Sequence, residues 1–167
     1  MRGEVLRRTG QRGHGPRLVA IIDSDRKGPN DDASSDARRL QRTCEQCRVP
    51  CWVHAKREAE NYLPRVLLAE KRDAGADHSL RVEAWDRLTD DQKDFFDMKN
   101  GFPAEPAAVE GELFDGLSPR DRNLLSGGFG PNVHQCWNDW RGQAMQELRA
   151  RGRGDLERGI ALIREGV

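Results

Sequence analysis

One short apolar run constrains the fold of this chain more than any other feature. Leu18-Val19-Ala20-Ile21-Ile22 is followed at once by Asp23-Ser24-Asp25. An uninterrupted apolar run of this length is typical of a strand buried on both faces, as in a parallel sheet. Ligands of open α/β sheets bind at the carboxyl ends of such strands. If the extended conformation continues through Asp25, the two carboxylates face one spot and repel each other unless a cation or a proton lies between them.

A helix and a second strand follow this run. Ser34 or Ser35 can cap the helix, and its apolar residues recur at helical spacing: Ala37, Leu40, Cys44 and Cys47. Residues 49–54 are predicted to form a short strand, with Pro50 near its start, where proline is tolerated. A strand, a helix and a strand of this size form a right-handed βαβ unit with parallel strands.

The parallel arrangement brings the ends of both strands to one edge of the sheet. Residues 55–63 are therefore expected beside Asp23 and Asp25, and they contribute a second pair of carboxylates, Glu58 and Glu60. Hard cations such as Mg²⁺ prefer carboxylate oxygens, so these four acids are the candidate ligands of one or two metal ions. Side chains two apart on a helix diverge, so we expect either Glu58 or Glu60 to turn to a basic neighbour.

The second half of the chain is predicted to be helical. Helices are expected at residues 58–69 (with a kink or restart at Pro64), 82–88, 90–98, 110–117, 133–149 and 156–163. Two strands are few for an α/β domain, so a third is expected at residues 4–6 or 79–82, or outside this chain. The predicted organisation is a lead-in at residues 1–17, an α/β core at 18–103 and a helical extension, packed on the core, at 104–167.

The amino-acid composition limits the classes of protein to which this chain can belong. The chain has 28 basic and 28 acidic residues, so it has no general affinity for nucleic acid, and such binding would need a local basic face. No apolar run approaches the ~20 residues of a membrane span, and residues 1–15 lack the apolar segment of a signal peptide. Four cysteines without a secretory signal are expected to be reduced thiols in a cytoplasmic protein.

Asp23-Ser24-Asp25 after one strand and Lys56-Arg57-Glu58-Ala59-Glu60-Asn61-Tyr62-Leu63 after the next resemble the TOPRIM-type nuclease domain of the OLD family of ATP-dependent endonucleases. The resemblance covers residues 18–63 and extends loosely to residues 95–101, where such domains place a lysine near the metal. It implies a TOPRIM/Rossmann-like parallel sheet and an endonuclease that cleaves DNA with Mg²⁺ or Mn²⁺. It also implies a role in phage defence or DNA repair, with an ABC-type ATPase as partner. The implied catalytic residues are Asp23, Asp25, Glu58 and Lys99.

One part of the family pattern is not found. TOPRIM domains begin with a strand that ends in a catalytic glutamate, and the 17 residues before Leu18, with Glu4 as their sole acid, are too few for that unit. We therefore expect an N-terminally incomplete domain. The alternative function is a catalytically incomplete module that binds a partner or regulates it. In an active site, Lys99, or Lys56 and Arg57, would stabilise negative charge on the phosphate.

Other patterns admit competing interpretations. A phosphatase of the HAD type also has Asp-x-Asp after a strand, but it requires Thr or Val where Lys27 stands here. Cys44-x2-Cys47-x3-Cys51-x2-His54 has the spacing of a zinc site, whereas its position on an apolar stripe and in a strand favours buried thiols. Four arginines are expected to form a solvated helix face, with contacts to DNA phosphates as the alternative: Arg38, Arg39, Arg42 and Arg48. Trp137 and Trp140 are expected to pack in the core, with stacking on nucleic-acid bases as the alternative.

Overall fold

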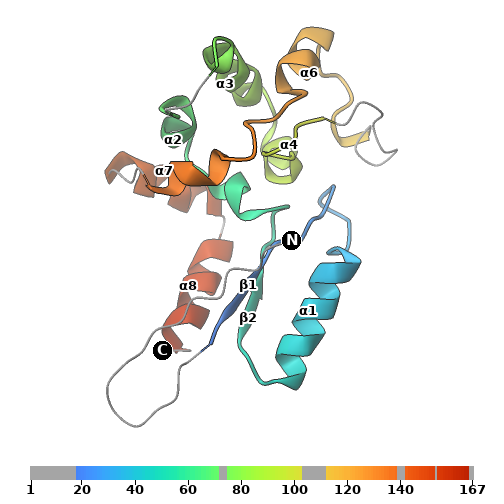
Figure 1. Cartoon of the computed structure of the whole chain (residues 1–167), viewed down its shortest axis with the longest axis vertical. Helices are drawn as coiled ribbons and strands as arrows, with labels where there is room; N and C mark the ends of the chain where they lie inside the picture. The colour runs from blue at the N-terminus through green and yellow to red at the C-terminus, as the bar shows by residue number, and fades with distance from the viewer. Residues whose placement is uncertain (1–17, 72–74, 103–111, 139–141, 153, 166–167) are drawn as a thin grey trace.

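The computed structural model describes residues 18–71, 75–102, 112–138, 142–152 and 154–165. In one half of the molecule, β1 (Ala20–Ile22) and β2 (Cys51–Val53) pair in parallel, with Ile21 opposite Trp52. Helix α1 (Ser35–Gln46) connects the two strands (Figure 1). The predicted strand, helix and parallel strand are thus confirmed.

Two helices cover this sheet. The hydroxyl of Ser34 accepts a hydrogen bond of 3.1 Å from the backbone N–H of Ala37, which caps α1 as predicted. Helix α1 contacts both strands, and α8 (Asp155–Glu165) packs against β2 from the opposite side (Figure 1). Within α1, Ala37 is buried but Cys47 at the C-cap is exposed, so the predicted apolar stripe ends before Cys47.

The strands are less buried than the sequence predicts. Ile22 and Trp52 are buried, whereas Ala20 and Ile21 are only partly buried and Leu18 is 39% exposed. The reason is the width of the sheet: in the described part of the chain it has two strands, and each strand has a neighbour on one side only. The expectation of a strand buried on both faces is therefore wrong for the first residues of β1.

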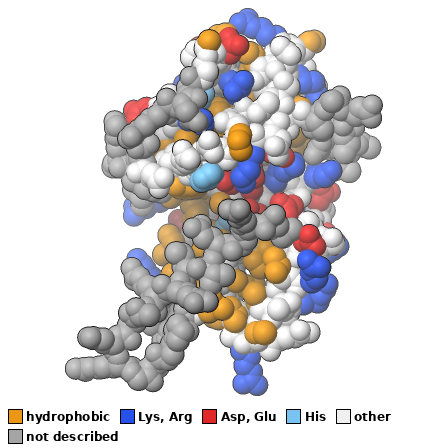
Figure 2. Space-filling model, viewed as in Figure 1, with side chains coloured by type: hydrophobic (Ala, Val, Ile, Leu, Met, Phe, Trp, Pro, Cys, Tyr) orange, Lys and Arg blue, Asp and Glu red, His pale blue; other side chains and the backbone are white. Residues whose placement is uncertain are grey.

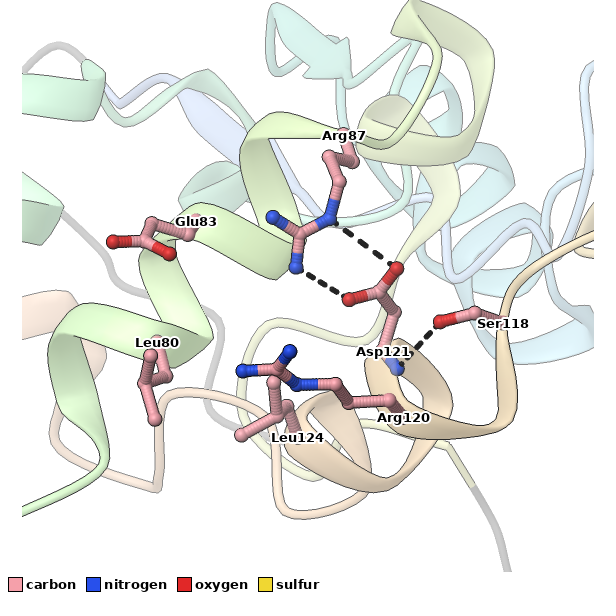
Figure 3. A pocket seen from close by; sticks show the side chains of 7 residues that line it. All are labelled: Leu80, Glu83, Arg87, Ser118, Arg120, Asp121 and Leu124. Carbon is pink, nitrogen blue, oxygen red and sulfur yellow. Dashed lines mark hydrogen bonds and ion pairs between the residues drawn. The ribbon is translucent and has the colours of Figure 1, made fainter.

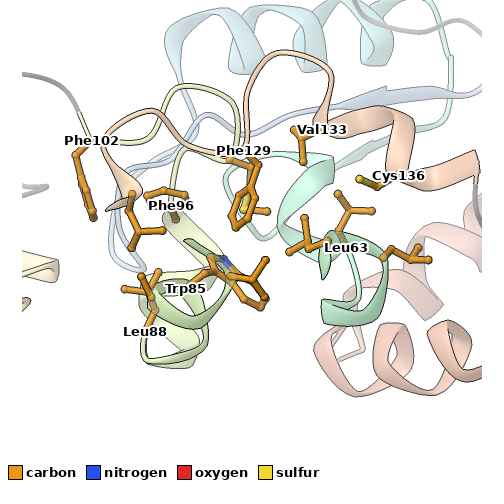
Figure 4. Packing of buried hydrophobic residues seen from close by; sticks show 14 of the residues in the cluster. Leu63, Trp85, Leu88, Phe96, Phe102, Phe129, Val133 and Cys136 are labelled. Carbon is orange, nitrogen blue, oxygen red and sulfur yellow. The ribbon is translucent and has the colours of Figure 1, made fainter. Parts of the chain in front are cut away.

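The other half of the molecule is helical. Its elements are η1 (Ala59–Tyr62), α2 (Arg65–Ala69), α3 (His78–Asp86), α4 (Asp90–Phe95), α6 (Pro119–Leu125), η2 (Val133–Asn138) and α7 (Gly142–Gly152). They enclose the main hydrophobic core, in which Leu63, Trp85, Phe96 and Phe129 pack together (Figure 4). Trp137 packs against this core and also against a smaller cluster formed by Trp52, Tyr62 and Leu148, and so connects the two halves.

Several predicted boundaries differ from the structure. Pro64 is the N-cap of α2, as the predicted restart requires, but the turn before it is a 3-10 helix. Residues 79–82 lie in α3, so the alternative of a strand there is wrong. Helix α6 was not predicted, although Ser118 and Pro119 are typical of a helix start. The predicted helix at 133–149 is η2 and part of α7, separated by undescribed residues. Other expectations fall wholly or partly outside the described residues: the lead-in at 1–17, the strand at 4–6, the helix at 110–117 and the packing of Trp140.

Candidate functional site

The carboxyl ends of the two strands bring Asp23 and His54 side by side. Each follows directly after its strand, and the register pairs Ile22 with Val53. Nδ1 of His54 lies 3.0 Å from Oδ1 of Asp23, and the backbone N–H of Ala59 donates to the same oxygen at 2.9 Å. Burial alone would raise the pKa of Asp23, but the hydrogen bond and charge of His54, the Ala59 N–H and the charge of Lys99 outweigh it and hold this pKa below its ordinary value.

Asp25 reaches the same region by a different backbone route from the one predicted. Its φ is 53°, so the extended conformation does not continue through this residue. Its backbone N–H donates to the carbonyl of Arg57 at 2.9 Å, and its Oδ2 accepts from the hydroxyl of Ser34 at 3.2 Å. Burial and the negative charge of Asp23 raise the pKa of Asp25 despite the bond from Ser34. The two carboxylates therefore interact, although the strand ends before the second of them.

Glu58 and Glu60 both face Lys99. Both residues are buried: Glu58 is 7% exposed and Glu60 is 5% exposed. Nζ of Lys99 lies 2.6 Å from Oε2 of Glu58 and 3.1 Å from Oε2 of Glu60. A glutamate was expected to turn to a basic neighbour, and both do so; the expected divergence of the two side chains on a helix is not observed. The residues do not lie on one α-helix: Glu58 is extended (φ −146°), and Ala59–Tyr62 is a 3-10 helix. Lys99, which the resemblance links to the site, thus touches two of its acids.

Charge and burial shift the titration of this cluster. Burial, together with repulsion from Glu60, raises the pKa of Glu58 to about 7, although its bond to Lys99 acts in the opposite direction. Burial would lower the pKa of Lys99, but the bond to Glu58 and the charges of both glutamates outweigh it and keep this pKa above its ordinary value. Lys99 is therefore a permanent cation beside two carboxylates. Figure 2 shows acidic and basic side chains close together across the middle of the molecule.

The backbone around Lys99 is fixed by a close approach of two loops. The N–H groups of Phe129 and Gly130 donate to the carbonyls of Met98 and Lys99 at 2.7 and 3.1 Å. Gly101 has φ 71°, and a Cβ at this position would lie 2.0 Å from the carbonyl oxygen of Leu125. Only glycine allows both this backbone conformation and this distance. The loop that carries Lys99 is thus held in place by its neighbour.

Asn61 organises the backbone that carries the glutamates. Its side chain is fully buried, accepts from the N–H of Glu58 at 2.9 Å and donates to the carbonyls of Lys93 and Phe96 at 2.8 and 2.9 Å. The N–H of Met98 in turn donates to Oε1 of Glu58 at 2.8 Å. These bonds tie the segment after β2 to the segment after α4.

The other two candidate cations have carboxylate partners. Lys56 is buried, and its Nζ lies 2.5 Å from Oδ1 of Asp94. Arg57 is partly buried and pairs with Asp97 at 3.0 Å. The structure thus places Lys99, rather than Lys56, in contact with Glu58 and Glu60.

Asp155 is a buried residue of the site's scaffold that the sequence analysis did not single out. It begins α8 and accepts hydrogen bonds from Nε1 of Trp52 at 3.1 Å, from the N–H of Ala55 at 2.9 Å and from the hydroxyl of Tyr62. Burial would raise its pKa, but these bonds outweigh burial and lower it. Asp155 therefore anchors the last helix to the segment between His54 and Glu58. No sequence spacing indicates this contact, because the partners lie about 100 residues away.

Two of the four candidate acids, Asp23 and Asp25, are suited to hold a hard cation such as Mg²⁺. Among the described residues, no three His, Cys, Asp or Glu side chains form a group that could hold a metal ion. However, Mg²⁺ is commonly held by one or two carboxylates together with water and substrate phosphate oxygens. Asp23 and Asp25 match that pattern, since each has one carboxylate oxygen without a hydrogen bond from another described residue. Glu58 and Glu60 are engaged with Lys99 instead.

The zinc interpretation finds no support in the geometry. Cys47 is exposed at the end of α1, and the ring of His54 contacts Asp23. Cys44 and Cys51 are partly buried thiols, as the apolar pattern suggested. Arg38, Arg39, Arg42 and Arg48 are all exposed, as expected for a solvated face.

Comparisons of this chain with protein-family models, with curated proteins and with solved structures find no match. In the part of the chain that the structure describes, no helix combines the length and the apolar character needed to cross a membrane.

Proposed function

We propose that this chain is a TOPRIM-like, metal-dependent endonuclease domain that hydrolyses DNA phosphodiesters with Mg²⁺ or Mn²⁺. One observation carries the proposal: acids from the ends of two parallel strands and a lysine from a third segment meet at one edge of the sheet. Asp23 and Asp25 follow β1, Glu58 and Glu60 follow β2, and Lys99 contacts the second pair. The sequence resemblance over residues 18–63 supports the same class of site.

Each residue has a distinct role in this proposal. Asp23 and Asp25 would hold the metal ion, which supplies Lewis-acid activation of water and stabilisation of the leaving oxygen. His54 orients Asp23 through their hydrogen bond, in the manner of the outer residues that position metal ligands. Lys99 places a positive charge where the phosphate develops negative charge, and Glu58 and Glu60 position its ammonium. Because both glutamates contact Lys99, they would act through it in this proposal.

DNA is the proposed substrate, and an ABC-type ATPase in phage defence or DNA repair is the proposed partner. Both follow from the resemblance. The two-stranded sheet is compatible with such a partnership, because each strand has one edge unpaired among the described residues. An unpaired edge can accept a strand from another chain or another part of a longer chain.

A plasmid assay tests the proposed activity. Purified protein is incubated with supercoiled DNA and Mg²⁺ or Mn²⁺, and nicked and linear products are quantified. We expect cleavage by the wild type, loss of at least about a hundredfold in Asp25→Asn, and full activity in Asp115→Asn, because Asp115 is an exposed acid outside the site. Equal activity of Asp25→Asn and the wild type would exclude the proposed site.

A second candidate function is a catalytically incomplete module that binds and regulates a partner. The engagement of Glu58 and Glu60 by Lys99 favours it, because two of the four acids that the sequence predicts as metal ligands are then neutralised within the protein. Absence of cleavage by the wild type, combined with tight partner binding that Asp25→Asn does not alter, would support this candidate over the nuclease.

A further inference from the structure

A pocket of about 240 Å³ lies between the start of α3 and the loop formed by residues 126–131, and none of Asp23, Asp25, Glu58 and Glu60 lines it. Its lining combines basic side chains with glycine backbone: Lys71, Gly75, His78, Arg81, Gly127 and Gly130. None of the residues that line it is acidic. The electrostatic character of this pocket therefore favours an anion.

A second pocket on the other side of α3 has a different character. Its volume is about 230 Å³, and it contains both signs of charge. Arg87 pairs there with Asp121 at 2.5 Å, and Glu83 lies close by (Figure 3). Because Asp121 already balances Arg87 and Glu83 adds a further negative charge, that pocket has a weaker preference for an anion. The contrast identifies the glycine-lined pocket as the candidate ligand site.

Arg81 is arranged for a ligand with several oxygens. Its Nε donates to the carbonyl of Leu124 at 2.9 Å, which fixes the plane of the guanidinium. Its two terminal amino groups form no hydrogen bond with another described residue. A planar guanidinium with two adjacent donors matches the geometry of phosphate oxygens. Lys71 adds a second positive charge to the same pocket.

The glycine backbone that lines the pocket leaves space for a ligand to approach it closely. A Cβ built on Gly75, Gly127 or Gly130 would meet no atom within 4 Å. Glycine at such positions lets a ligand come close to the peptide backbone. The opposite wall is fixed, because Nε2 of His78 lies 2.7 Å from the carbonyl oxygen of Leu68 and its ring packs edge-on against Phe129. The pocket is thus preformed and accessible.

We propose that this pocket binds a phosphate group, with Arg81 and Lys71 as its cationic contacts and the backbone at Gly127 as its floor. The ligand class is a phosphate ester, either the terminal monoester or the internal diester of a nucleotide chain. This inference goes beyond the proposed nuclease and does not rest on it, because none of the five residues assigned to catalysis or metal binding lines the pocket.

Phosphate binding is measured on the full chain in EDTA, by calorimetric titration with inorganic phosphate. We expect saturable binding by the wild type and an affinity about tenfold lower in Arg81→Gln, because hydrogen bonds to charged groups are typically strong enough for such a loss. Lys71→Gln is expected to weaken binding several-fold. Gly127→Ala adds a methyl group to the open space without changing charge, and it should weaken binding as well.

Two further features make the test decisive. Arg42→Gln removes an exposed positive charge on α1 and should leave binding unchanged, and unfolding curves of all variants verify that they are folded.

A trinucleotide with a 5′-phosphate and the same trinucleotide without it distinguish the source of the phosphate. Tighter binding of the first indicates a terminal monoester, and equal binding indicates a diester. No saturable binding by the wild type, or unchanged binding in Lys71→Gln, Gly127→Ala and Arg81→Gln, would overturn the proposal. Because the titration contains no divalent cation, its failure leaves the plasmid assay unaffected.

Discussion

The ammonium of Lys99 lies 2.6 Å from Oε2 of Glu58, a carboxylate that is otherwise enclosed by protein. The two residues are 41 positions apart, and their contact joins the segment after β2 to the segment after α4. Glu60 shares the same ammonium. One cation therefore balances two buried acids, so the stability of this region depends on the charge at position 99.

Replacement of Lys99 by methionine is predicted to destabilise the protein. The variant would leave Glu58 and Glu60 buried without their counter-charge, which we expect to lower the free energy of unfolding by roughly 3 kcal/mol at pH 7. Urea denaturation measures this change. Lys99→Arg keeps the charge and should lose much less stability. If Lys99→Met and the wild type have the same denaturation midpoint, the ammonium does not stabilise the cluster.

The pKa of Glu58 predicts a pH dependence of stability. Its folded-state pKa is raised from 4.5 to about 7, so the folded protein binds more protons than the unfolded chain between these values. Its contribution to stability is therefore present below about pH 4.5 and is lost as the pH rises through about 7. Denaturation of the wild type and of Glu58→Gln at several pH values measures this contribution. The wild type should lose on the order of 2–3 kcal/mol relative to the variant as the pH increases across this window. Parallel curves for the two proteins would contradict the assigned pKa.

The sequence was sufficient to predict the first half of this site. A buried run that ends in acids, a capped helix and a second short strand have strong local signals, and parallel pairing then places residues 55–63 beside Asp23. The parallel pairing also implies that Asp23 and His54 lie side by side, because both residues directly follow paired strands. The spacing Cys44-x2-Cys47-x3-Cys51-x2-His54 points to a zinc ligand instead, which directs attention away from the contact of His54 with Asp23.

Asp155 is predicted to be essential for the position of α8. Replacement by alanine would leave Nε1 of Trp52, the N–H of Ala55 and the hydroxyl of Tyr62 without their acceptor in a buried environment. We expect a loss of about 3–5 kcal/mol in the free energy of unfolding.

Thermal unfolding and limited proteolysis of α8 measure the effect of Asp155→Ala. Glu157→Ala is the matched control, because Glu157 is an exposed acid two residues further along the same helix. Equal stability of Asp155→Ala and the control would show that the buried carboxylate does not anchor the helix.

Two glycines in neighbouring loops should respond differently to the same substitution. At Gly101, φ is 71° and a Cβ would lie 2.0 Å from the carbonyl oxygen of Leu125, so alanine is expected to cost roughly 2–4 kcal/mol and to displace Lys99. At Gly127, a Cβ meets no atom within 4 Å, and alanine should change stability by less than ~0.5 kcal/mol. Urea denaturation compares the two variants, and equal losses would show that the close approach of the loops is unimportant.

Contacts between distant segments could not be predicted from the sequence. Lys99 lies in a stretch with no regular periodicity, and nothing local indicates that its side chain reaches back to Glu58. The left-handed conformation of Asp25 and the 3-10 helix after Glu58 are likewise set by tertiary hydrogen bonds, such as those from Asp25 to Arg57 and from Asn61 to Phe96. The direction in which each acid points could therefore not be deduced from strand or helix geometry.

The most direct test of the proposed site is a titration of the protein with Mn²⁺, followed by electron paramagnetic resonance of the free ion. If Asp23 and Asp25 hold the cation, the wild type binds Mn²⁺ saturably, and Asp25→Asn binds it at least about tenfold more weakly, a difference of ~1.4 kcal/mol. Asp115→Asn, which removes an exposed acid elsewhere, should bind as the wild type does. Absence of binding by the wild type, or equal affinity in Asp25→Asn, would contradict a metal site at the end of β1.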